Sequence, residues 1–115
     1  MLTNKDLRKW QKRLGLTEWR VQLNPSCHPQ SMTLQNCAGE TEWTESIKSA
    51  RISILGEQYY GQRIVPFDAE KTLVHELLHL KFALLGQSGN DFQDRYVHQL
   101  IDDLARAFID AERSK

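Results

Sequence analysis

Two histidines and a glutamate in TLVHELLHL, residues 72–80, have the spacing of a metal-dependent hydrolytic site. His75 and His79 are four residues apart, so on a helix they project from the same face and could bind one Zn²⁺ together. Glu76 would lie about a hundred degrees further round the helix axis, which keeps it from joining that pair of ligands. It could instead take a proton from water bound to the metal. The stretch therefore predicts two ligands and a general base.

A catalytic zinc site normally has three protein ligands, so the third must come from another part of the chain. In QDRYVHQLIDD, residues 93–103, His98 is the expected third ligand, and Asp94 is the alternative. Asp102 is expected to accept the free N–H of a ligating imidazole, with His75 as its first partner. The sequence thus predicts one Zn²⁺ per chain, supported by a carboxylate.

Two consecutive helices would have to position these side chains. Pro66 and Asp68 form a helix start, which predicts a helix from about Ala69 to Leu85 that stops at Gly86. A second helix is expected from about residue 91 to 111, where apolar residues recur at spacings of three and four. His75 and His79 fall on the first of these helices, and His98 falls on the second.

The first half of the chain favours a helix followed by a small sheet. Leu7, Trp10 and Leu14 have helical spacing, and Gly15 is expected to end that helix. Alternating polarity predicts strands at residues 18–23 and 50–55, and a further strand is expected at residues 38–43, although that segment is polar and carries Gly39. The chain is therefore expected to be a single α+β domain over residues 1–115, with helices packed on an antiparallel or mixed sheet of about three strands.

Composition excludes some partners. The chain has 115 residues, 40% of them hydrophobic, and its 15 basic residues equal its 15 acidic ones. The formal net charge is therefore zero, and it does not favour binding to nucleic acid or to an anionic membrane. The N-terminus becomes polar at once, without the apolar segment of a secretory signal, and the most apolar run is too short to span a bilayer. These features predict a soluble cytoplasmic protein.

Cys27 and Cys37 lie in a stretch rich in turn-forming residues, beside His28. Three interpretations are open: a second metal site, a disulfide bond, or two free thiols. The spacing lacks the paired C-x-x-C pattern of zinc sites, and disulfides are rare in a reducing cytosol. Two free thiols are therefore the favoured prediction.

The segment VHELLHL at residues 74–80 and the order of elements resemble zincin-type metallopeptidases, specifically the very small single-domain ones encoded in bacterial and phage genomes. The last helix resembles that of the gluzincin branch, where a glutamate supplies the third ligand and an aspartate four residues later supports a histidine. Here His98 stands in place of that glutamate, and Asp102 matches the aspartate. The glycine and third histidine that follow the motif in metzincins are absent.

This resemblance implies a zinc-dependent peptidase in which Glu76 takes a proton from water and later delivers it to the leaving amine. The segment ARISIL at 50–55 resembles the strand that borders the zincin cleft, so an extended peptide substrate is expected to pair with its edge. Tyr59, Tyr60 and Arg63 are candidates for stabilising the oxyanion.

Two other functions remain open. A zinc-stabilised binding domain would use the same ligands without catalysis. Certain zinc-dependent ribonucleases also carry H-x-x-L-H, although they lack a glutamate at the position of Glu76, and this chain is not basic.

Overall fold

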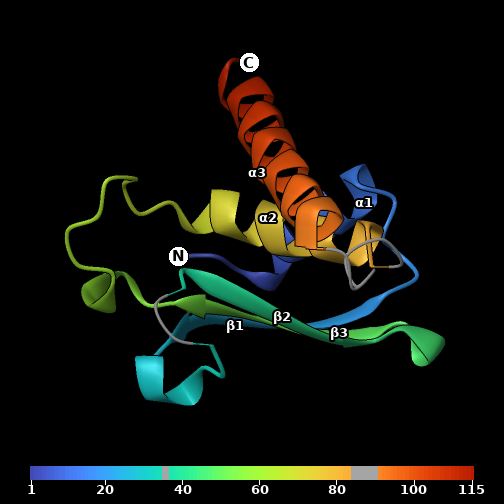
Figure 1. The fold of residues 1–115 in the computed structure, drawn as a ribbon, viewed down its shortest axis with the longest axis horizontal. Coiled ribbons are helices and arrows are strands. Elements are labelled where there is room, and N and C mark those ends of the chain that lie inside the picture. The colour runs from blue at the N-terminus through green and yellow to red at the C-terminus, as the bar shows by residue number, and fades with distance from the viewer. Residues whose placement is uncertain (35–36, 84–90) are drawn as a thin grey trace.

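In a computed structural model, which describes residues 1–34, 37–83 and 91–115, α1, α2 and α3 lie on one side of a three-stranded sheet (Figure 1). The described elements follow the order α1 (Asn4–Arg13), β1 (Arg20–Cys27), η1 (Pro29–Ser31), β2 (Gly39–Thr44), η2 (Glu45–Ile47), β3 (Ser49–Leu55), η3 (Glu57–Tyr59), α2 (Ala69–Lys81) and α3 (Asp91–Arg113). The predicted α+β class is confirmed, with a helix before the sheet and two helices after it.

The sheet is mixed, in the order β1-β3-β2. β1 runs parallel to β3, with Val21 opposite Ala50, whereas β2 is antiparallel to β3, with Thr41 opposite Ile52. β3 is therefore the central strand. Its residues from Ile52 onward are buried without alternation, which is typical of a strand covered on both faces.

The central position of β3 makes one expectation wrong. A peptide was expected to pair with the edge of residues 50–55, but both edges of β3 already bond to neighbouring strands. Its main-chain donors and acceptors are thus engaged within the sheet. β1 and β2 each have only one neighbour in the sheet among the described residues, so these two are the edge strands.

Local signals explain where the helices begin and end. Thr3 Oγ1 accepts the N–H of Asp6, and the Asp6 carboxylate accepts the N–H of Thr3, so a reciprocal cap starts α1. Gly15, at φ 71°, follows the end of α1, as its left-handed conformation favours. Asp68 caps α2 by accepting the N–H of Lys71 at 3.1 Å. α2 ends at Lys81. Leu85 and Gly86, where the sequence predicts the end of this helix, lie outside the described residues.

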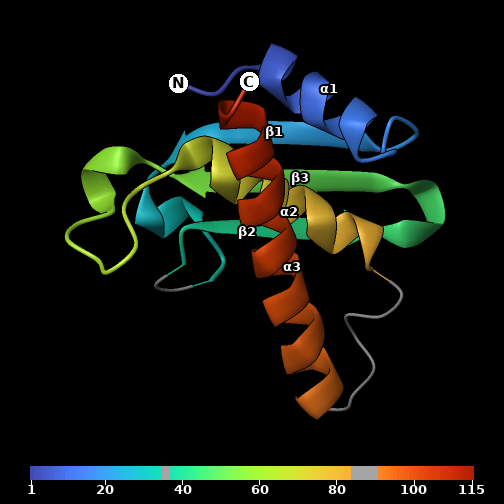
Figure 2. The ribbon, with the colours of Figure 1, turned by 90° about the horizontal axis from the view of Figure 1, so that it is seen from above.

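α2 is the middle layer of the fold, because α3 crosses over it on the side away from the sheet (Figure 2). Six of its thirteen residues are buried, and they are not confined to one narrow stripe. A helix enclosed on opposite sides needs apolar residues around most of its circumference. The largest fully buried side chains of the core are Trp10, Ile52, Ile54, Leu73, Val74, Leu77 and Ile101.

Cys27 and Cys37 are free thiols, as favoured by the sequence. His28 does not join them; its Nδ1 accepts the N–H of Gln30 at 3.1 Å and caps η1. Among the described helices, none is long and apolar enough to cross a membrane.

Candidate metal centre

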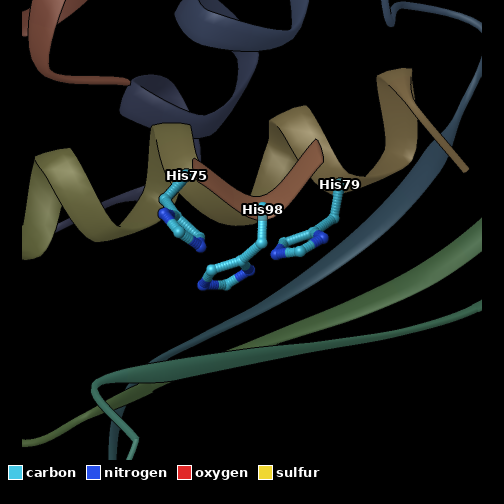
Figure 3. Close-up of side chains that lie close together, drawn as sticks. All are labelled: His75, His79 and His98. Atoms are coloured by element: carbon cyan, nitrogen blue, oxygen red, sulfur yellow. The ribbon is translucent and has the colours of Figure 1, made fainter. Parts of the chain in front are cut away.

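α2 and α3 bring three imidazole rings together above the sheet (Figure 3). His75 and His79 project from α2 and His98 reaches them from α3, with ring centroids 5.1–5.5 Å apart. One ligand nitrogen from each ring lies within 4.8 Å of the other two. Four-coordinate zinc with Zn–N bonds of about 2.0–2.1 Å places its ligands about 3.3 Å apart, so small ring movements would close this cluster on one ion. The three residues could therefore hold a metal ion.

Asp102 lies beside His75, as expected for a supporting carboxylate. Asp102 Oδ1 is 3.3 Å from His75 Nδ1, which directs the Nδ1–H of the imidazole toward the carboxylate. This contact leaves Nε2 as the nitrogen with a lone pair for a metal. The same aspartate is 3.7 Å from the Arg106 guanidinium one turn later, which helps to hold it in place.

Burial keeps the two histidines of α2 in the form that binds metals. Burial, together with the neighbouring His75 and His98, lowers the pKa of His79 to about 4. Burial also lowers the pKa of His75, which the nearby Asp102 partly opposes. Neutral imidazole is the ligating form, so no proton has to leave these rings near pH 7.

Glu76 is buried at the base of the same cleft, with only 6% of its surface exposed. Burial raises the pKa of its carboxyl group to about 7, although a hydrogen bond from Thr41 opposes that shift. Thr41 Oγ1 is 2.6 Å from Glu76 Oε1. A carboxylate whose pKa lies near neutrality can both accept and return a proton at physiological pH.

β2 supplies residues that the sequence analysis did not assign to the site. Gly39 lies so close to α2 that an added Cβ would come within 2.6 Å of Thr72 Cγ2 and 3.3 Å of Glu76 Oε2. Thr41 is two residues further along the same strand. A glycine inside a strand can mark such a close approach, and Gly39, Thr41 and Trp43 share one face by their spacing of two.

An open cleft of about 640 Å³ surrounds the cluster, in the size range of pockets for small ligands or single side chains. Polar groups from α2, α3 and β2 meet at its centre. The apolar part of the lining consists of Leu34, Trp43, Val65, Pro66, Phe82, Ala83 and Ile101. The arrangement could admit an extended chain beside β2.

The alternative ligand Asp94 does not belong to the group of three ligand atoms that meet within 4.8 Å. Asp94 lines a separate surface hollow on α3, together with His98 and Asp102. The structure therefore brings His98, rather than Asp94, to the two histidines of α2.

The three oxyanion candidates have different positions. Tyr60 lines the cleft, but its hydroxyl donates to the main-chain oxygen of Val65 at 2.6 Å. Tyr59 packs edge-on against His28, with the ring centroids 4.7 Å apart. The Arg63 guanidinium lies over the Tyr60 ring, and its Nε donates to the Tyr60 main-chain oxygen. Tyr59 and Arg63 are not among the described residues that line the cleft.

Comparisons of this chain with protein families, with curated proteins and with solved structures find no match. Its function must therefore be argued from the site itself. Three imidazoles, a supporting carboxylate and a buried glutamate beside an open cleft make up that site.

Proposed function

We propose that this protein is a zinc-dependent metallopeptidase, with His75, His79 and His98 as ligands and Glu76 as the general base. The observation that carries the proposal is the placement of the Glu76 carboxyl group in the same cleft as the three imidazoles. A metal used only for stability has no need of a base beside it. Three protein ligands also leave a fourth position on zinc for chemistry.

Zinc bound here would supply a Lewis acid that polarises a carbonyl group and makes water more acidic. Glu76 would accept the proton of the attacking water and then donate it to the departing amine. The carboxyl pKa of about 7 suits both steps. Asp102 would keep His75 in the tautomer that presents Nε2, through its contact at Nδ1.

An extended peptide would lie along β2. This strand lines the cleft and has no sheet neighbour on its outer side among the described residues. Main-chain hydrogen bonds to a strand edge bind peptides with little dependence on side chains. The apolar lining by Trp43 and Phe82 would favour apolar residues near the scissile bond.

A zinc-stabilised binding domain is the second candidate. The observation in its favour is the hydrogen bond from Thr41 to Glu76, because it links α2 to β2 and would give Glu76 a structural role without catalysis. Both candidates require the three histidines. Only the peptidase requires an ionisable group at position 76.

Hydrolysis of a quenched-fluorescent peptide library by zinc-loaded protein separates the two candidates. Glu76→Gln should retain about one zinc per chain, while cleavage falls by about 10²- to 10⁴-fold because the general base is lost. Glu45→Gln is the matched control, since this exposed glutamate in η2 does not line the cleft.

Equal cleavage by wild type and Glu76→Gln would refute the role of Glu76. Zinc-loaded wild-type protein that cleaves no member of the library would favour the binding domain.

A further inference from the structure

We propose that Thr41 is the positioning residue for Glu76, holding its carboxyl group in one place throughout proton transfer. The inference rests on the proposed peptidase function, and it assigns a catalytic contribution to β2 in addition to substrate binding. It follows from the geometry of three groups: the Thr41 hydroxyl, the Glu76 carboxyl and the Glu76 main-chain carbonyl.

The Thr41 hydroxyl lies between two oxygens of the same residue. Its Oγ1 is 2.6 Å from Glu76 Oε1 and 3.3 Å from the Glu76 main-chain oxygen. A hydroxyl has one proton to donate and can accept as well. With Glu76 ionised, the hydroxyl donates to Oε1, at the short distance typical of a charge-assisted hydrogen bond.

The same contact can persist when Glu76 carries the proton. The attacking water's proton is then taken up at Oε2, which leaves Oε1 as the carbonyl oxygen of the acid, still able to accept the Thr41 hydroxyl. The contact is kept without movement of heavy atoms, because Oγ1 already lies 2.6 Å from Oε1. A general base that later acts as an acid requires such a partner, since the carboxyl group must stay aligned in both forms.

The other side of the carboxyl group is bounded by Gly39. Glu76 Oε2 would be 3.3 Å from a Cβ at this position, and Thr72 Cγ2 would be 2.6 Å from it. The missing side chain thus allows β2 to come close enough for Thr41 to reach Oε1. Gly39 and Thr41 lie on one face of β2, so a single strand both supports the carboxyl group and limits its movement.

Thr41→Val removes the hydroxyl with little change of shape, Thr41→Ser keeps it, and Thr44→Val is a control at the far end of β2. Two properties are measured. The first is the carboxyl-carbon NMR resonance of Glu76 in zinc-free protein, assigned by its loss in Glu76→Gln. The second is peptide cleavage by zinc-loaded protein, with kcat, KM and zinc affinity determined separately.

Thr41→Val should shift the Glu76 resonance and lower kcat by about 10- to 100-fold, the effect typical of removing a partner of a site residue. KM and zinc affinity should stay within about twofold of wild type. Thr41→Ser should restore both the resonance and kcat, and Thr44→Val should change neither.

An unchanged resonance in Thr41→Val would overturn the inference, because Thr41 would then contact only the main chain. An unchanged kcat, or a loss of kcat that merely follows a loss of zinc, would overturn it too. Zinc-loaded wild-type protein that cleaves no peptide refutes the peptidase and, with it, the catalytic contribution of Thr41. The carbon resonance then decides separately whether Thr41 holds the carboxyl group.

Discussion

Two polar clusters of this protein lie along α3 and differ in the way their charges are satisfied. The cleft cluster consists of His75, Glu76, His79, His98 and Asp102. The ion-pair cluster joins the ends of the three helices and consists of Lys9, Arg13, Asp68, Glu70, Glu112 and Arg113.

In the ion-pair cluster, opposite charges face each other directly. Lys9 Nζ is 3.1 Å from both Glu70 and Glu112, and Arg13 is 2.7 Å from Glu112. The hydrogen bonds from Arg13 and then Lys9 lower the pKa of Glu112 to about 2, which favours its charged form. These groups satisfy one another, so no ligand is needed to explain them.

In the cleft cluster, burial is the main cause of the pKa shifts, and it moves groups toward their neutral forms. The pKa of His79 falls to about 4, whereas that of Glu76 rises to about 7. Neutral imidazoles with converging nitrogens can accept a cation from outside the chain. The direction of the pKa shifts, more than the number of charged residues, therefore distinguishes the cleft cluster, a candidate ligand site, from the ion-pair cluster.

Zinc should produce the largest difference between the clusters. Saturating zinc at 100 to 1,000 times its dissociation constant should stabilise wild-type protein by about 3–4 kcal/mol, because only the folded state assembles the three ligands. His79→Ala should abolish that gain, as measured by thermal unfolding with and without zinc. His28→Ala is the control, since this histidine lies outside the cluster. A gain that survives in His79→Ala would mean that zinc binds elsewhere.

Glu76→Gln should stabilise the zinc-free protein at high pH. The folded-state pKa of Glu76 is raised from 4.5 to about 7, so wild-type protein loses stability as the pH rises through that interval. Above it the loss is about 3 kcal/mol, and a glutamine avoids it. Urea unfolding at pH 5 and pH 8 should therefore show a larger difference between variant and wild type at pH 8. A difference that shrinks at pH 8 would contradict the raised pKa.

The smallest effect is expected in the ion-pair cluster. Arg113 donates to both carboxylate oxygens of Asp68, at 2.7 and 2.9 Å, but its side chain is half exposed. Arg113→Ala should cost about 0.5–1 kcal/mol at neutral pH and low salt, with zinc affinity unchanged. Arg113 lowers the pKa of Asp68, so the bridge stabilises above the ordinary aspartate pKa and is lost as the pH falls below it. Denaturant unfolding at several pH values and salt concentrations measures the contribution of this ion pair to stability. A loss of zinc affinity in Arg113→Ala would show instead that the two clusters are coupled.

The helices and the candidate ligand residues could be predicted from the sequence because their signals are local. His75 and His79 are one helical turn apart, and Asp68 marks the start of their helix. His98 required only the assumption that the next helix packs on the first. The contact between Asp102 and His75 followed from the same assumption.

The arrangement of strands was less accessible, because it depends on pairing between distant segments. β1 pairs in parallel with β3, and β2 occupies the outer position beside the cleft. The sequence of β3 alternates in polarity around Ser53, as a half-buried strand does, so it did not mark β3 as the central strand. Thr41 was not identified because its role comes from the approach of β2 to α2, which neither segment encodes alone.

Because α3 is long, a small tilt of this helix would produce a large displacement of His98, the third candidate ligand. Ala105 is fully buried, and taken as the pivot it lies seven residues, or about 10 Å, from His98. A tilt of about 5° at that pivot would move the His98 backbone by about 1 Å, several times the roughly 0.2 Å tolerance of a metal–ligand bond. A substitution of the buried Ala105 could thus displace His98 and weaken metal binding without changing a candidate ligand.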